Sequence, residues 1–154
     1  MRIITVLGTR PEIIKLSRII PKFDEFFKNY LVHTGQNYDY ELNKIFFKDL
    51  SIRKPDFFLK AATGNNIQTI ANIINKFGEI CKKIKPDAVF ILGDTNSGLS
   101  AITAKKFKIP IFHYEAGNRC FDINVPEEIN RKIIDHVSDI NLTYSQIAKQ
   151  YLIK

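Results

Sequence analysis

Short apolar segments alternate along the chain with longer segments in which apolar residues recur every three or four positions. The short segments are rich in β-branched residues and predict strands at 2–7, 31–34, 57–60, 88–92, 110–115 and 140–142. The periodic segments predict helices at 11–28, 38–50, 66–84, 97–106, 127–137 and 145–152. Strands that alternate with helices in this way indicate a parallel sheet with helices on both faces.

The predicted strands are almost entirely apolar, as strands covered on both faces need to be. The pattern therefore predicts a Rossmann-like, doubly wound α/β fold. The 154 residues correspond to one domain, and no repeat or linker divides them. A chain with 45% hydrophobic and 25% charged residues is neither a disordered tail, a collagen-like repeat nor a coiled coil.

No apolar run approaches the ~20 residues that cross a bilayer, and the first residues do not resemble a signal peptide. The two cysteines and three histidines lack the spacing of a metal site, so no metal is expected. These features predict a soluble cytoplasmic protein without a membrane partner.

The net charge of +7 comes mostly from lysine, and two lysine clusters stand out, at 82–85 and at 105–108. Each cluster closes a predicted helix just before a proline, where lysines complement the negative end of the helix dipole. Two alternative explanations of the positive charge are a face that binds nucleic acid and an attraction for an anionic small substrate. The expectation is that nucleic acid is not a partner.

Glycines and polar residues gather in the loops that follow the predicted strands. Four of the seven glycines fall in these loops: Gly8, Gly35, Gly93 and Gly117. Ligands bind at the carboxyl ends of the strands in such sheets. Because the four loops open at the same sheet edge, we expect their polar groups to converge on one cleft.

Two of these loops carry candidate groups close to the start of a helix. Arg10 stands at a helix N-terminus, where backbone N–H groups favour an anion and an arginine can bind phosphate or carboxylate. Residues 8–11 could instead form only a tight turn. Asp94 could supply a functional carboxylate or serve as a helix N-cap, for which Thr95 and Ser97 are rivals.

Three further carboxylates are candidates for acid–base chemistry. Glu115 ends an apolar strand, where an unpaired buried carboxylate is costly. It therefore needs a partner, such as Arg119 or His113, or a role as a general acid or base. Glu127 and Glu128 lie in the first turn of a helix, where the helix dipole already favours acidic residues.

Five ordered motifs resemble those of the non-hydrolysing UDP-N-acetylglucosamine 2-epimerases. They are Gly-Thr-Arg-Pro-Glu at 8–12, Thr-Gly-Gln at 34–36, Gly-Asp-Thr at 93–95, Glu-Ala-Gly at 115–117 and Pro-Glu-Glu-Ile-Asn-Arg at 126–131. The resemblance implies one half of a glycosyltransferase-B (GT-B) type fold, with substrate between two Rossmann-like halves. Residues 1–154 then form the amino-terminal domain, and the carboxy-terminal UDP-binding domain is absent from the sequence.

The resemblance also implies a reaction and a set of site residues. The family eliminates UDP from UDP-GlcNAc and adds it back with inversion at C2, which gives UDP-ManNAc without a cofactor. By motif match, the catalytic acids correspond to Asp94, Glu115 and Glu127. Four residues are similar to substrate-binding or supporting positions: Arg10 near the diphosphate, Gln36 in a segment like the family's allosteric UDP-GlcNAc site, and Arg119 and Arg131.

Residues 33–43, 93–97 and 117–122 resemble most closely a capsule and O-antigen subgroup that acts on UDP-6-deoxy-N-acetylhexosamines in making UDP-N-acetyl-L-fucosamine. The substrate is then a UDP-N-acetylhexosamine, either UDP-GlcNAc or this analogue. The other half of the family's fold holds most UDP contacts and a catalytic histidine, so the chain alone is expected to be inactive. It is also expected to form a homodimer, as family members commonly do. The alternatives are a non-catalytic UDP-sugar-binding module and a basic nucleic-acid-binding domain.

Overall fold

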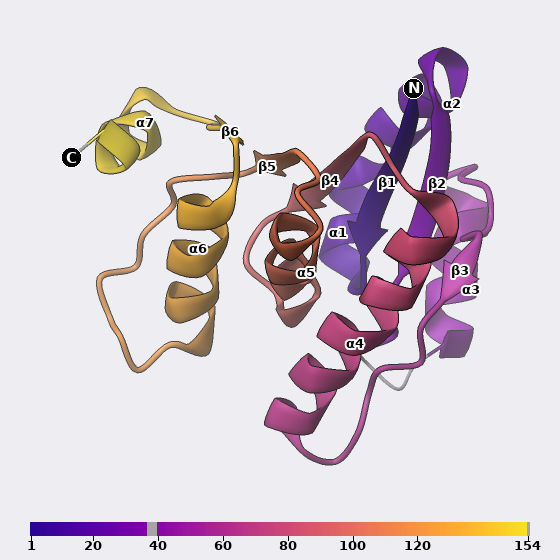
Figure 1. The fold of residues 1–154 in the computed structure, drawn as a ribbon, viewed down its shortest axis with the longest axis horizontal. Coiled ribbons are helices and arrows are strands. Elements are labelled where there is room, and N and C mark those ends of the chain that lie inside the picture. The colour runs from indigo at the N-terminus through magenta and orange to yellow at the C-terminus, as the bar shows by residue number, and fades with distance from the viewer. Residues whose placement is uncertain (37–39, 154) are drawn as a thin grey trace.

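The computed structural model describes residues 1–36 and 40–153, which form a parallel sheet with helices on both faces (Figure 1). The strand order is β3-β2-β1-β4-β5-β6, and every pair of neighbouring strands is parallel. This is the order of a doubly wound Rossmann sheet, so the predicted fold class is confirmed. The strands are β1 (Arg2–Leu7), β2 (Lys28–His33), β3 (Phe57–Phe58), β4 (Ala88–Leu92), β5 (Ile111–Tyr114) and β6 (Ile140–Leu142).

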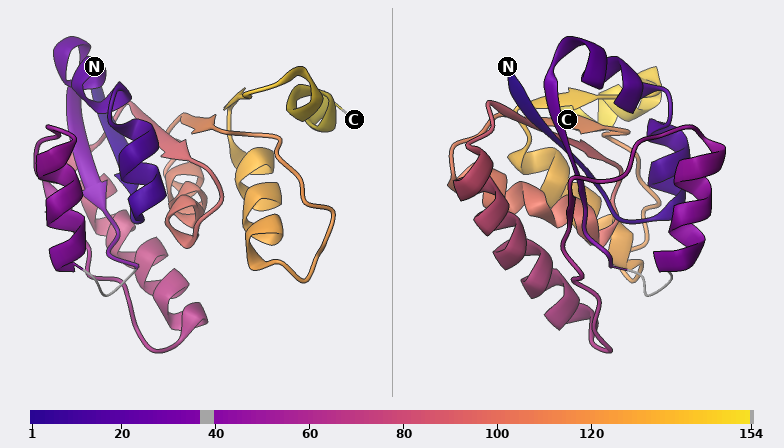
Figure 2. Two further views of the ribbon diagram at one scale, coloured as in Figure 1. Left: turned by 180° about the vertical axis from the view of Figure 1, so that it is seen from behind. Right: turned by 90° about the vertical axis from the view of Figure 1, so that its right-hand side faces the viewer.

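The helices divide between the two faces of the sheet, as the end-on view in Figure 2 shows. One face is covered by α1 (Arg10–Leu16), α2 (Ile19–Phe26) and α3 (Tyr40–Asp49). The other face is covered by α4 (Asn66–Ile84), α5 (Ser100–Lys106) and α6 (Pro126–Val137). A short 3-10 helix, η1 (Asn96–Leu99), leads into α5, and α7 (Gln146–Ile153) follows β6.

Each face of the sheet has its own apolar core, and β4 shows how one strand serves both. Val89 and Ile91 pack in the core under α4 and α5, whereas Phe90 and Leu92 pack in the core under α1 and α2. All four side chains are buried. A strand that is buried on both faces has no polar face, which explains the uninterrupted apolar runs of the sequence.

The third strand ends at Phe58 rather than at residue 60, and the predicted helix 97–106 begins as the 3-10 helix η1. Two further predicted elements differ more from the structure. The predicted helix 11–28 is two helices, interrupted at Ser17 and Arg18. Pro21 has no backbone N–H to donate to the carbonyl oxygen of Ser17, and in a continuous helix its ring would clash with that carbonyl. The second strand begins at Lys28 rather than at Leu31, because it pairs with the whole length of β1. The predicted helix start at residue 38 lies outside the described residues.

The lysine clusters lie where the sequence places them. Lys82 and Lys83 occupy the last turn of α4, and Lys105 and Lys106 occupy the last turn of α5. The prediction that each cluster closes a helix is therefore confirmed. Within the described part of the chain, no helix has the length and apolar character needed to cross a membrane.

Candidate active site

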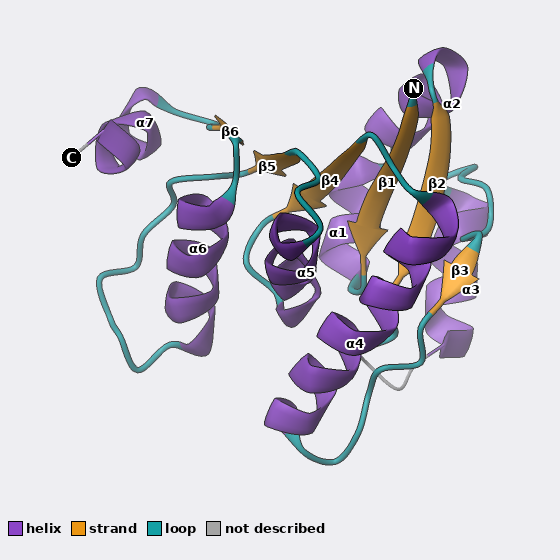
Figure 3. Ribbon diagram, viewed as in Figure 1, coloured by secondary structure: helices purple, strands orange, loops and turns teal. Residues whose placement is uncertain are grey.

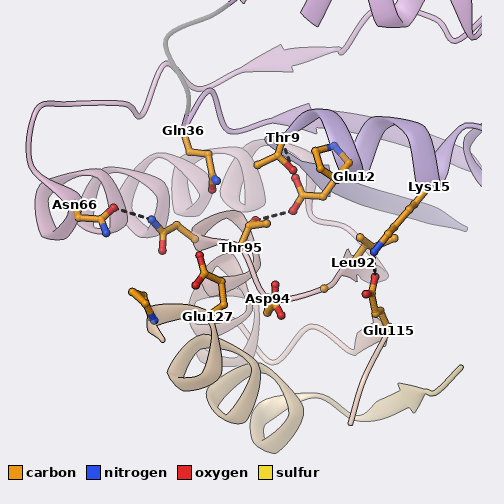
Figure 4. A pocket seen from close by; sticks show the side chains of 14 residues that line it. Thr9, Glu12, Lys15, Gln36, Asn66, Leu92, Asp94, Thr95, Glu115 and Glu127 are labelled. Carbon is orange, nitrogen blue, oxygen red and sulfur yellow. Dashed lines mark hydrogen bonds and ion pairs between the residues drawn. The ribbon is translucent and has the colours of Figure 1, made fainter. Parts of the chain in front are cut away.

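A pocket of about 490 Å³ opens at the carboxyl edge of the sheet, bounded by the loops after β1, β4 and β5 and by the start of α6 (Figure 4). The cleft expected from the loop pattern is therefore present. Four predicted site residues line this pocket: Gln36, Asp94, Glu115 and Glu127. Thr9, Glu12, Lys15, Asn66, Thr95 and Asn96 are the other polar residues around it.

Three turns meet closely at one wall of the pocket. A Cβ atom added at Gly8 would lie 2.0 Å from Thr34 Oγ1 and 2.1 Å from Ser97 Oγ, so only glycine fits between them. These two hydroxyl oxygens are 2.7 Å apart and share a hydrogen bond. Gln36 Oε1 accepts hydrogen bonds from the backbone N–H and the hydroxyl of Ser97, each at 2.9 Å. Gln36 therefore joins the β2 loop to η1.

The buried carboxylate of Glu12 joins two turns in the same wall of the pocket. It accepts hydrogen bonds from the N–H groups of Gly8 at 2.6 Å and Thr9 at 2.8 Å, and from the Thr95 hydroxyl at 2.6 Å. Burial raises the pKa of Glu12 and outweighs these hydrogen bonds, which lower it. The sequence analysis did not select Glu12, although Thr9 and Glu12 have the Thr-x-x-Glu spacing of a capping box.

Asp94 is free of a capping role. Thr95 is the residue that caps η1, since its hydroxyl oxygen accepts the Ser97 N–H at 3.2 Å. Asp94 Oδ2 instead accepts a hydrogen bond from Arg131 Nε at 2.9 Å and a second, short one from Arg131 Nη2. Arg131 therefore holds Asp94 from α6.

The adjacent acids Glu127 and Glu128 have different environments. Glu127 is exposed and lines the pocket, whereas Glu128 is fully buried. Burial alone would raise the pKa of Glu128, but hydrogen bonds from Cys120, Lys132 and Arg131 lower it to about 2. Glu128 is thus an ionised anchor between the β5–α6 loop and α6, and of these two acids only Glu127 lines the pocket.

Glu115 pairs with a residue that the sequence analysis overlooked. Its Oε2 lies 2.6 Å from Lys15 Nζ, which reaches across from α1. The expectation that Arg119 or His113 is its partner is wrong, because both contact Asp135 instead. The only signal for Lys15 was its position three residues after Glu12, on the same helix face.

Three of the four predicted binding residues, Arg10, Arg119 and Arg131, do not line the pocket. Arg119 Nη1 donates a hydrogen bond to the Asp135 carboxylate at 2.6 Å and another to the backbone carbonyl oxygen of Asn118 at 2.7 Å. Arg10 is exposed at the first position of α1 and forms no hydrogen bond or ion pair with another described residue. Across residues 1–36 and 40–153, no group of three His, Cys, Asp or Glu side chains is arranged to hold a metal ion.

Comparison with known proteins matches the sequence and the fold of this chain to one family. The family described as UDP-N-acetylglucosamine 2-epimerase matches residues 22–154. A structure of UDP-N-acetylglucosamine 2-epimerase from Rickettsia bellii is 60% identical and superposes with a TM-score of 0.93 over 99% of this chain and 41% of its own. The Methanocaldococcus jannaschii enzyme, solved with UDP-GlcNAc and UDP, is 39% identical, with a TM-score of 0.95 over 99% of this chain and 43% of its own.

A third relative, the UDP-2,3-diacetamido-2,3-dideoxy-D-glucuronate 2-epimerase of Pseudomonas aeruginosa, is 40% identical over 96% of this chain and 43% of its own length. The chain thus spans less than half the length of these relatives. Its fold and pocket define a Rossmann-like domain of the GT-B type with an acid-lined ligand pocket. The chain belongs to the UDP-N-acetylglucosamine 2-epimerase family.

Proposed function

We propose that these 154 residues are the amino-terminal half of a sugar-nucleotide 2-epimerase that acts on a UDP-N-acetylhexosamine. One observation carries the proposal: the candidate acids Asp94, Glu115 and Glu127 come from three different elements and line one pocket. Inversion at C2 requires a proton to leave one face of the sugar and return to the other. Acids that approach from separate elements can serve the two faces.

Carboxylates outnumber cations in the pocket lining, so an anionic leaving group depends on the two cations of α1. Lys15 Nζ lies in the pocket lining beside Glu115, and Arg10 extends from the N-terminal end of α1. Cations placed where negative charge develops stabilise the transition state of an elimination. In this proposal Lys15 and Arg10 favour departure of UDP, and Asp94, Glu115 and Glu127 exchange the C2 proton.

The remainder of the site belongs to a second domain. Relatives with this fold are more than twice as long, and the family resemblance assigns most UDP contacts and a catalytic histidine to their other half. We therefore propose that the 154 residues alone do not turn over substrate. A dimer remains a prediction from the family, and a cytoplasmic location remains a prediction from the sequence.

The sugar is UDP-GlcNAc or a close analogue. The Methanocaldococcus jannaschii relative was solved with UDP-GlcNAc, which supports UDP-GlcNAc as the substrate. The Pseudomonas aeruginosa relative is named for a different UDP-acetamido sugar, which supports a close analogue. The 6-deoxy substrate that the subgroup motifs suggest stays a prediction. The second candidate function, a non-catalytic UDP-sugar-binding module, would use the same pocket without proton transfer.

The test is a chimera in which this chain replaces the matched part of the Rickettsia bellii relative. The chimera is expected to interconvert UDP-GlcNAc and UDP-ManNAc, measured by proton NMR, whereas the 154 residues alone are not. Asp94→Asn in the chimera should lower kcat by about 100-fold or more, the usual contribution of a general acid or base.

Asp87→Asn is the matched control, because Asp87 is an exposed carboxylate just before the opposite end of β4. It should leave the rate unchanged. A chimera that binds UDP-GlcNAc without converting any of the sugars would favour the binding module. Equal losses from Asp94→Asn and Asp87→Asn would contradict the assignment of Asp94.

A further inference from the structure

Glu115 lies in backbone conformation that a glutamate rarely adopts. Its φ is 71°, in the left-handed region, where a side chain costs about 1–2 kcal/mol relative to ordinary backbone. Six described residues other than glycine have positive φ, and Glu115 is the one among them that lines the pocket. Such conformations persist only where surrounding contacts impose them.

Asp135 on α6 supplies those contacts on both sides of Glu115. Its Oδ1 lies 2.9 Å from Nδ1 of His113, two residues before Glu115. The N–H of Gly117, two residues after Glu115, donates to the same carboxylate at 3.2 Å and 3.3 Å. Arg119 Nη1, four residues after Glu115, donates to Oδ2 at 2.6 Å. One carboxylate therefore holds the chain before and after the strained residue.

The anchor is itself firmly fixed. Asp135 and His113 are buried, and His113 Nε2 contacts the carbonyl oxygen of Gly93 at 2.8 Å, which ties the anchor to the β4 loop as well. The backbone carbonyl of Asp135 accepts a hydrogen bond from Asn141 of β6 at 3.0 Å. Figure 3 shows α6 alongside the loop that joins β5 to α6, the loop that begins with Glu115.

We propose that Asp135 is a positioning residue that forces Glu115 into the left-handed conformation and thereby aims its carboxylate at Lys15 and the pocket. Arg119 belongs to this anchor rather than to the ligand. In this proposal Asp135 touches no substrate and acts through Glu115. Its effect on catalysis rests on the proposed function, whereas its effect on the backbone of Glu115 does not.

The backbone effect is tested in the 154-residue chain by comparing Glu115→Gly with Glu115→Ala. Both variants remove the ion pair with Lys15, and they differ only by the Cβ methyl group, which disfavours left-handed backbone in the Ala variant. With Asp135 present, the Gly variant should be the more stable by about 5- to 30-fold in the unfolding equilibrium constant, the equivalent of the left-handed cost. The same comparison in an Asp135→Asn background should show no advantage for Gly, because the loop is no longer forced.

Asp139→Asn is the matched control, since the Asp139 carboxylate holds the opposite end of β5 through the N–H of Ile111 at 2.9 Å. The advantage of Gly should survive there. If Asp135→Asn does not fold, Arg119→Met removes one contact of the anchor and should reduce the advantage in part. An advantage that persists unchanged in both the Asp135→Asn and Arg119→Met backgrounds would overturn the proposal.

In the chimera, Asp135→Asn should lower kcat at least 10-fold with little change in KM, and should add no further loss to Glu115→Gln. Losses that multiply would show that Asp135 acts independently of Glu115 and would overturn the link to catalysis. If the unmodified chimera does not epimerise at all, the proposed function fails. The stability comparison of the Gly and Ala variants still decides the backbone effect.

Discussion

Asp94 and Glu115 reach the pocket from neighbouring strands, and different parts of each residue are held in place. After β4, Gly93 takes the left-handed conformation with φ 69°, so Asp94 avoids it and is fixed through its side chain by Arg131. After β5, Glu115 itself is left-handed with φ 71°. Its ionic partner, Lys15, has a side chain that is 43% exposed.

The difference separates two ways of presenting an acid at the edge of one sheet. On the β4 side, an ion-pair network that includes the buried Glu128 fixes the carboxylate of Asp94. On the β5 side, contacts to the backbone fix Glu115, and its side chain is left with a solvent-facing partner. The stability of the β4 side should therefore fall when a charge is removed, and that of the β5 side should change with the backbone freedom of the residue at position 115.

The largest expected effect is the loss of Arg131. Arg131→Met leaves Asp94 without its partner and removes the 2.8 Å ion pair of the fully buried Glu128. Removing one member of a buried ion pair costs about 3–5 kcal/mol when the remaining charge is left without a partner. Lys132 Nζ still lies 3.4 Å from Glu128 Oε1, so the loss should lie at the lower end of this range, at about 3 kcal/mol. We expect a loss of that size in the free energy of urea unfolding, and a loss below about 1 kcal/mol would contradict the network.

Acid should destabilise the same network by less than Arg131→Met does. At low pH Glu128 takes up a proton and loses its charge, whereas in Arg131→Met the charge stays buried with fewer partners. Its hydrogen bonds lower its pKa from 4.5 to about 2. A lowered carboxylate pKa stabilises the fold at pH above the unfolded value, and this contribution is lost as the pH falls from about 4.5 towards 2. Unfolding free energies measured from pH 6 to pH 3 should fall less steeply in Glu128→Gln than in the unmodified chain.

The adjacent Glu127 provides the control for this pH dependence. Glu127→Gln removes an exposed carboxylate of the same helix turn. It should leave the slope of stability against pH unchanged. Equal slopes for the unmodified chain and Glu128→Gln would show that Glu128 does not carry the acid sensitivity.

Gly93→Ala tests whether the β4 turn also depends on backbone freedom. A Cβ at Gly93 would meet only Glu115 Oε2, at 3.9 Å, so the cost comes from the positive φ and not from crowding. We expect a loss of about 1–2 kcal/mol in unfolding free energy. Gly64→Ala is the control, because Gly64 has open space and no positive φ. Equal effects at both positions would contradict the account of the turn.

The smallest effect should come from Lys15→Met. A salt bridge with one partner 43% exposed contributes less than about 1 kcal/mol to stability and weakens further as salt is added. The variant should therefore unfold almost as the unmodified chain does in urea, at low and at high salt. A loss comparable with that of Arg131→Met would remove the contrast between the two sides of the pocket.

Much of this site follows from local sequence pattern. Apolar strands and interposed helices fix the parallel order, and the residues directly after each strand must then meet at one edge. Gln36, Asp94 and Glu115 are such residues and all line the pocket. Glu127 could be placed only by family resemblance, because helix-dipole arguments apply equally to its neighbour Glu128.

The partners of these residues could not be predicted in the same way. Lys15 meets Glu115 from 100 positions away, and Asp135 contacts His113 of β5 and Arg119 of the following loop from the last turn of α6. Both contacts depend on how α1 and α6 pack on the sheet, which no short pattern encodes. Resemblance places Arg119 among the substrate-binding or supporting residues, but a motif does not show whether an arginine pairs with a substrate anion or with a buried aspartate.

The most direct test of the central claim is exchange of the C2 proton with solvent. The chimera with the Rickettsia bellii relative is incubated with UDP-GlcNAc in deuterated buffer, and the sugars are followed by proton NMR. The account predicts UDP-ManNAc that carries deuterium at C2, and no deuterium when the 154 residues are used alone. Epimerised product that keeps its original C2 proton would contradict acid–base catalysis by Asp94, Glu115 and Glu127.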